Sequence, residues 1–69
     1  MSLYIEYGTK RILGNDLQQR EIWRQIKSLE TEDHSNAILI RLKDSDIVIE
    51  EIYIKSGTVL PDGRVFSID

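Results

Sequence analysis

The short connections between apolar runs most restrict how this 69-residue chain can fold. After residue 36, four strand-like runs follow one another, separated only by short segments at Lys43–Asp46, Ser56–Gly57 and Pro61–Gly63. A parallel crossover needs about a dozen residues or more, so connections this short join antiparallel neighbours. The second half of the chain therefore predicts an antiparallel sheet.

The chain begins with the pattern of a half-buried strand. Leu3, Ile5 and Tyr7 have the period-2 spacing of side chains that share one face of a sheet. The next segment, Gly8–Arg11, allows two readings, because glycine in a strand pattern fits either a turn or a bulge. The two apolar residues after it are accordingly a return strand or a strand end.

A helix is predicted next. Asn15 and Asp16 are residue types that accept hydrogen bonds from the first-turn N–H groups, and either can form a capping box with the glutamine three residues later. We expect the helix to run from Asp16 to about Thr31. At 100° per residue, one third of its circumference carries the apolar residues expected to face the core, Ile22, Trp23, Ile26 and Leu29. Leu17 falls on the opposite side, where local packing near the helix start is its simplest role.

Two strands should follow the helix. Ala37–Lys43 is apolar on both faces in its first half, which predicts a central strand with Ile38, Ile40 and Leu42 on one face. The next run, Ile47–Lys55, loses its alternation in the middle. One extra residue at Glu50-Glu51 restores a single apolar face, so we predict a β-bulge there.

The clearest local signal is Pro61-Asp62-Gly63, a turn sequence between two apolar segments, which predicts a C-terminal hairpin. The predicted fold is therefore α+β, a single domain over residues 1–69. One amphipathic helix packs on a mainly antiparallel sheet of three to five strands, in the order strand, helix, strand, strand, strand.

Size and composition limit what can hold such a domain together. The chain has no cysteine and one histidine, so disulfides and thiolate metal sites are excluded. A domain of this length buries only about 60% of its unfolded surface. Association with another copy or another protein is the remaining way to bury more.

Nothing in the sequence marks it for a membrane. There is no apolar run of bilayer length, and the first residues lack both the basic segment and the apolar core of a signal peptide. We therefore expect a cytoplasmic protein.

The usual catalytic patterns are missing. The four glycines are isolated, so no phosphate-binding glycine loop can be written. His34, the single imidazole, falls in a polar loop with little support for catalysis. Glu50 and Glu51 are a paired-carboxylate candidate, but cross-strand pairing with Arg41 or Lys43 is the plainer reading. We predict no enzyme activity, catalytic residue, cofactor or metal site, and leave open whether the acidic loop over 30–34 binds a cation.

Two surfaces are candidates for binding. Arg20, Arg24 and Lys27 lie along one stripe of the predicted helix beside Trp23, a pattern that suits an acidic protein surface or a nucleic-acid backbone. The second surface is the end of the chain, whose apolar residues have little sequence left to cover them. Its candidates are Val65, Phe66 and Ile68.

Charge distribution favours a protein partner. Residues 1–29 carry five basic and three acidic residues, whereas residues 30–69 carry four basic and nine acidic residues. This polarity suits oriented association, and the net charge of −3 disfavours nucleic acid. We therefore predict a small protein-interaction module, such as an accessory subunit, an inhibitor or a phage- or immunity-type protein, that binds a protein partner or forms a homodimer. Nucleic-acid binding through the helix stripe is the alternative.

Overall fold

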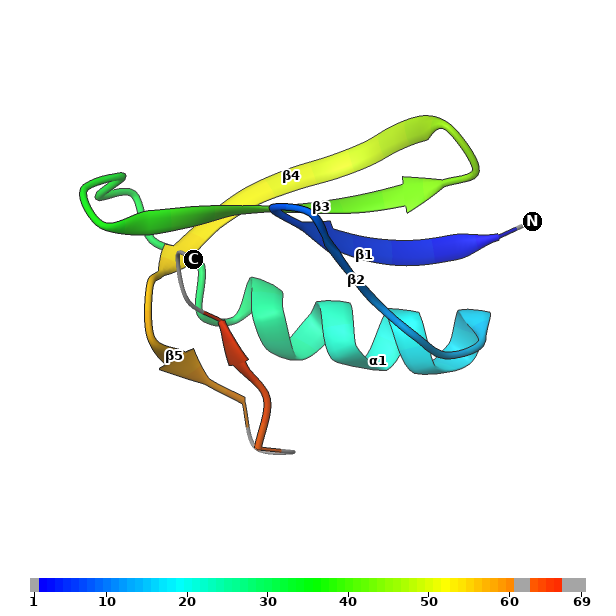
Figure 1. Cartoon of the computed structure of the whole chain (residues 1–69), viewed down its shortest axis with the longest axis horizontal. Helices are drawn as coiled ribbons and strands as arrows, with labels where there is room; N and C mark the ends of the chain where they lie inside the picture. Colours follow the sequence, from blue (N-terminus) through cyan, green and yellow to red (C-terminus); the bar gives the residue numbers. More distant parts are fainter. Residues whose placement is uncertain (1, 61–62, 67–69) are drawn as a thin grey trace.

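The computed structural model describes residues 2–60 and 63–66 and shows an α+β fold (Figure 1). Its elements in chain order are β1 (Leu3–Tyr7), β2 (Lys10–Ile12), α1 (Asp16–Lys27), β3 (Ala37–Asp44), β4 (Ile47–Lys55), β5 (Thr58–Val59) and β6 (Val65–Phe66). The described strands form an antiparallel four-stranded sheet in the order β2-β1-β3-β4 and a separate β5–β6 pair. Figure 1 shows α1 and the small β5–β6 pair on the same side of the large sheet. The prediction of one helix on an antiparallel sheet is confirmed.

The ambiguous segment after β1 is a turn. Tyr7 pairs with Lys10, so Gly8 and Thr9 form a two-residue hairpin connection between β1 and β2. Gly8 has a φ of 59°, which a residue without a side chain adopts at little steric cost. Residues 10–12 are therefore a return strand, and it forms one outer edge of the sheet.

The start of α1 is as predicted, but its end is earlier. The Asn15 side chain accepts from the Gln18 N–H at 2.9 Å, and the Gln18 side chain accepts from the Asn15 N–H at 2.8 Å, which completes the capping box. The helix ends at Lys27 rather than near Thr31. Thr31 donates its N–H to the Tyr53 carbonyl at 2.8 Å instead, so the residues after α1 turn back to the sheet.

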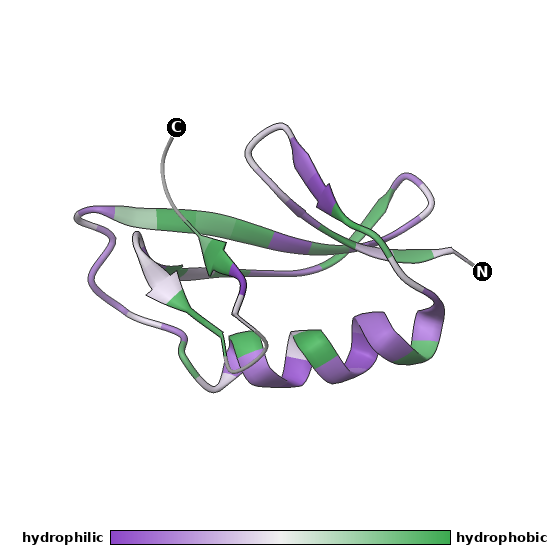
Figure 2. Ribbon diagram, turned by 60° about the horizontal axis from the view of Figure 1, so that its bottom comes forward, coloured by the Kyte–Doolittle hydropathy of each residue, from purple (hydrophilic) through white to green (hydrophobic). Residues whose placement is uncertain are grey.

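This early end changes the apolar stripe of α1. Trp23 and Ile26 are buried and Ile22 packs against the core, as expected. Leu29 lies beyond the helix and is 41% exposed, so its assignment to the stripe was wrong. Leu17 is 66% exposed and contributes little packing. In Figure 2 the polar and apolar bands alternate along α1, as in an amphipathic helix.

Among the described residues, one polar side chain belongs to the core. Gln19 is fully buried between the helix and the N-terminal hairpin. Its Oε1 accepts from the Ile5 N–H at 3.0 Å, and its Nε2 donates to the Ile12 carbonyl at 2.8 Å. The other buried core residues are apolar: Leu3, Ile5, Ile12, Trp23, Ile26, Ile38, Ile40, Leu42, Ile52, Ile54, Leu60 and Phe66.

Strand β3 lies inside the sheet, between β1 and β4, and buries Ile38, Ile40 and Leu42 as predicted.

The predicted bulge in β4 is present, but it lies one residue earlier than expected. Leu42 pairs with Glu50 and Lys43 pairs with the residue at 48, so the extra residue is at 49.

The expected consequence of the bulge was wrong. Instead of a continuous apolar face on the core, the first half of β4 exposes Ile47, Val48 and Ile49 by 69%, 43% and 52%. In Figure 1 this part of β4 lies farther from α1 than β1 and β3 do. The core needs only the second half of β4, where Ile52 and Ile54 are buried.

The C-terminal hairpin is confirmed. Val59 pairs with Val65, and the Gly63 N–H donates to the Leu60 carbonyl at 2.9 Å across the turn. The turn residues at 61–62 lie outside the described residues. Leu60 and Phe66 are buried in the common core, where the Phe66 ring meets the Tyr7 ring edge to face at 4.7 Å. The small β5–β6 pair therefore helps α1 to cover the sheet.

Candidate interaction site

Among the residues that the structure describes, the longest run of exposed apolar side chains on a strand is at the start of β4. Ile47, Val48 and Ile49, which we call the β4 edge patch, are consecutive residues of an outer strand. An outer strand presents backbone N–H and C=O groups to which another strand can pair. The patch therefore combines apolar side chains with an open backbone edge.

The second half of the same strand is covered by the chain itself. The Tyr53 carbonyl accepts the Thr31 N–H, and the His34 ring stacks on the Tyr53 ring at 3.8 Å. Asp33 also reaches Lys55, with 3.8 Å between its Oδ2 and the lysine Nζ. The loop between α1 and β3 thus occupies this part of the edge, and the patch is limited to the first half.

Two carboxylates follow the patch and each has a basic partner. Glu50 accepts the Lys27 Nζ at 2.5 Å, and Glu51 accepts the Arg41 Nε at 2.8 Å. These hydrogen bonds, followed by lesser charge effects, raise the pKa of Lys27 and the pKa of Arg41. The predicted pairing of this acidic pair with Arg41 is confirmed for Glu51, while Glu50 turns to the helix.

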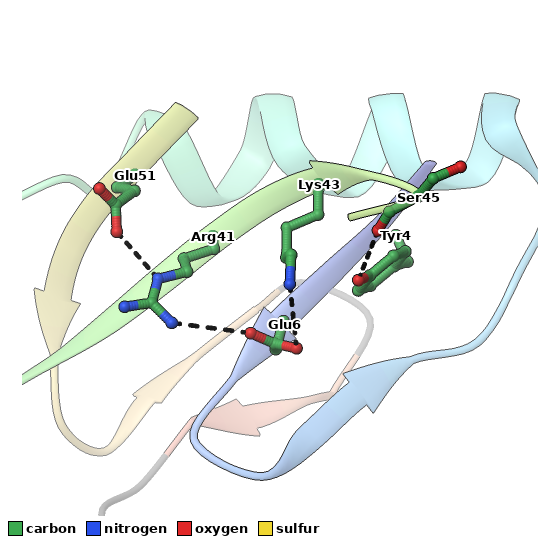
Figure 3. Close-up of polar contacts among 6 residues, drawn as sticks. All are labelled: Tyr4, Glu6, Arg41, Lys43, Ser45 and Glu51. Carbon is green, nitrogen blue, oxygen red and sulfur yellow. Dashed lines mark hydrogen bonds and ion pairs between the residues drawn. The ribbon is translucent and has the colours of Figure 1, made fainter. Parts of the chain in front are cut away.

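The face of the sheet opposite α1, the open face, carries a polar network. Figure 3 shows Glu6 between Arg41 and Lys43, at 3.7 Å and 3.9 Å from their nitrogens. The Tyr4 hydroxyl donates to the Ser45 carbonyl at 2.8 Å, and the guanidinium of the nearby Arg11 lies over the Tyr4 ring at 4.0 Å. Charged groups on this face are therefore matched by neighbours within the chain.

The predicted basic stripe of α1 is only partly free. Arg20 and Arg24 are exposed and form no ion pair with any residue that the structure describes. Lys27 is held by Glu50. Trp23 is only 6% exposed and packs in the core, so its side chain is not a contact surface in this fold.

The predicted C-terminal contact residues are separated by the hairpin. Val65 is 55% exposed, on the outer side of β6. Phe66 is fully buried by its own chain, so a partner does not reach it without disturbing the core. Ile68 lies outside the described residues. Of this group, Val65 alone is shown on the surface.

The acidic loop after α1 is organised by its own backbone. The Asp33 carboxylate accepts the Ser35 N–H at 3.0 Å, and this bond, with the nearby Lys55, lowers the pKa of Asp33. Within residues 2–60 and 63–66, no three His, Asp or Glu side chains gather as a metal site. No helix in that part of the chain is long and apolar enough to cross a membrane.

The β4 edge patch was missed at the level of sequence because its residues were assigned to the core. The available signal was the break in alternation at Ile49, since residues before a bulge need not face the same way as those after it. Leu13, the residue after β2, is 84% exposed, and the sequence pattern had left it as part of a strand end or a return strand. No protein-family model, curated protein or solved structure matches this chain, so a proposal of function rests on its own residues and surfaces.

Proposed function

We propose that this chain is a small non-enzymatic module that binds another protein through the β4 edge patch. The supporting observation is the exposure of three consecutive apolar residues on an outer strand, Ile47, Val48 and Ile49. Soluble proteins seldom leave such a strand uncovered, because it pairs with other chains and promotes aggregation. A partner that covers the patch removes this liability.

The mode of binding that suits the patch is addition of a strand. An extended partner segment gains backbone hydrogen bonds along the edge, while alternate side chains contact the two faces of the sheet. The covered region around Tyr53 sets the far limit of this contact, because its carbonyl is already bonded to Thr31. The partner strand therefore extends from the β3–β4 turn to about Glu51.

This mode fits the classes of protein expected for a chain of this size, namely accessory subunits, inhibitors and phage- or immunity-type proteins. Such proteins act by occupying a partner's surface, and they need no supported catalytic centre. We place this activity in the cytoplasm, in line with the composition of the chain.

The test disables the patch and asks whether binding is lost. The variant Ile47→Lys/Ile49→Lys places two charges on the edge, and Leu17→Lys is the control because that side chain is 66% exposed on α1. The wild-type chain and each variant are immobilised in turn, and the amount of protein that binds to each is compared. The free chain itself is one of the proteins offered for binding. Circular dichroism checks that each variant folds.

We expect the edge variant to lose its bound protein and the control to keep it. Equal binding by wild type and a folded edge variant would remove the patch as the contact surface. Loss of binding by both variants would point to a general effect of charge instead.

Nucleic-acid binding through α1 is the second candidate. It rests on Arg20 and Arg24, two exposed cations of α1 that form no ion pair with a described residue. Phosphate contacts weaken steeply with salt, so filter binding at two salt concentrations tests it. Binding that weakens with salt and is lost in Arg20→Gln/Arg24→Gln supports this candidate, whereas no retention of nucleic acid at low salt rejects it.

A further inference from the structure

We infer that the partner at the β4 edge patch is strand β2 of a second copy, joined so that the two sheets become one. This inference rests on the proposed function and names its partner. It makes the module self-associating, with two different edges in contact.

Strand direction permits this arrangement. Adjacent strands of the sheet are all antiparallel, and the order is β2-β1-β3-β4. With four such strands, the outer strands β2 and β4 run in opposite directions. A second copy placed alongside in the same orientation therefore brings its β2 antiparallel to β4, with both helices on the same side.

The two edges are complementary in sequence. Strand β2 and the residue after it read basic, basic, apolar, apolar at 10–13, and β4 reads apolar at 47–49 and acidic at 50–51. Antiparallel strands place the start of one opposite the end of the other. The basic end of β2 then meets the acidic residues of β4, and the apolar ends meet each other.

The backbone indicates a register in which Arg11 lies opposite Glu51 of the second copy. Tyr53 directs its carbonyl outward to Thr31. The backbone groups of residues two apart in a strand point the same way, so the backbone N–H and C=O of Glu51 also point outward. In β2 the Ile12 carbonyl is bonded by Gln19 on the β1 side, so the Arg11 carbonyl points away from β1. Both residues thus offer their backbone groups to a neighbouring strand.

Side chains agree with this register. Arg11 pairs with Glu6, Glu6 with Arg41, and Arg41 with Glu51, and residues paired across strands share a face. Arg11 and Glu51 therefore both lie on the open face. In the joined sheet they extend the polar network of that face across the junction.

The same register covers Leu13, the most exposed large apolar residue in the described part of the chain. Leu13 is two residues beyond Arg11, and the bulge at Ile49 brings Val48 opposite it. Leu13 is 84% exposed and Val48 is 43% exposed in the single chain. Contact between them removes apolar surface from water at both edges, which favours association.

Pairing of β4 with itself is the competing arrangement, and charge opposes it. With the bulge at Ile49 counted in the same way, an antiparallel two-fold contact centred on Val48 places Asp46 of one copy opposite Glu51 of the other, and does so twice. The β2–β4 contact has opposite charges at that end. Because the β2–β4 contact joins two different edges, a pair of copies still has one unpaired edge at each end. Further copies can add there, which builds a filament or closes into a ring.

The test uses one variant for each edge. Val48→Lys/Ile49→Lys disables β4, and Arg11→Glu/Leu13→Glu disables β2. Molar mass is measured by light scattering behind a sizing column over a range of concentrations. Circular dichroism and the fluorescence of the buried Trp23 confirm folding.

The wild type should rise above its 8.0 kDa monomer mass with concentration, and each variant alone should associate at least about tenfold more weakly. An equimolar mixture of the two variants should form a one-to-one dimer, since one keeps β2 and the other keeps β4. Val65→Lys is the control and should associate like the wild type.

Two results would overturn the inference. If the β2 variant alone dimerises as well as the wild type, β4 pairs with itself. If the wild type stays monomeric while a different protein binds through the β4 edge patch, the proposed function stands and the second copy is not the partner. Absence of both self-association and patch-dependent binding removes the proposed function too.

Discussion

The Gln19 side chain takes the place of a backbone strand partner for Ile12, whose carbonyl accepts the amide Nε2 at 2.8 Å. The same amide accepts the N–H of Ile5, the residue that pairs with Ile12 across β1 and β2. A helix side chain is thereby inserted between two strands. This ties α1 to the N-terminal hairpin by hydrogen bonds as well as by apolar packing.

Replacing Gln19 by leucine should therefore destabilise the fold although the new side chain is apolar and similar in size. The change leaves the Ile5 N–H and the Ile12 carbonyl without their partner, and each buried unsatisfied group costs about 1–3 kcal/mol. Urea unfolding followed by Trp23 fluorescence measures the loss. Gln25→Leu, on the exposed side of α1, is the matched control and should change little. Equal stability of both variants would contradict a structural role for the amide.

The role of Gln19 shows where sequence reasoning ends. Gln19, Trp23 and Ile26 are spaced as one helix face, so its burial follows from the same periodicity that predicted the stripe. The polar side chain concealed this, because glutamine is mostly exposed in proteins. Its two partners lie on strands of the N-terminal hairpin, whose pairing the local pattern left undecided.

Phe66 should be essential for stability rather than for binding. It is fully buried and meets the Tyr7 ring, so it holds the β5–β6 pair against the sheet. Phe66→Ala should lower the free energy of unfolding by about 3–5 kcal/mol, a large part of the stability of a domain this small. Val65→Ala, at the neighbouring exposed position, should cost far less. Thermal unfolding of both variants decides between them, and similar melting temperatures would contradict this role.

The sequence pattern predicted one apolar face along β4, and the exposure of its first half has a physical cause. Alternation alone required the bulge, and a bulge is present, but alternation does not say which half the helix covers. The helix ends at Lys27, and the remaining core is closed by Leu60 and Phe66 from the C-terminal hairpin. Helix length and hairpin placement are tertiary outcomes, so the exposure of Ile47 and Ile49 did not follow from their own pattern.

The capping box should make a measurable contribution to α1. Asn15→Ala removes the acceptor for the Gln18 N–H and should lower stability by about 1 kcal/mol. Asn15→Asp keeps that acceptor and should retain most of the stability. Chemical denaturation of both variants tests this pair. An aspartate variant as unstable as the alanine variant would show that the cap acts through something other than its side-chain oxygen.

The ion pair between Lys27 and Glu50 predicts a pH dependence at the alkaline end. The hydrogen bond to Glu50 raises the pKa of Lys27 above its ordinary 10.5, so the folded chain holds this proton more tightly than the unfolded chain. The stabilisation is therefore fully present below about pH 10.5 and is lost as the pH rises through the folded pKa. Lys27→Met should be less stable than wild type at pH 7, and this difference should shrink at pH 11.

Arg24→Met is the matched control, because Arg24 is exposed on the same helix and forms no ion pair with the described residues. Its effect on stability should not follow the Lys27 pattern, because Arg24 has no carboxylate partner among the described residues. Urea unfolding of the three proteins at both pH values provides the comparison. A Lys27→Met difference that stays constant between pH 7 and pH 11 would show that the Lys27 ammonium does not stabilise the fold through Glu50.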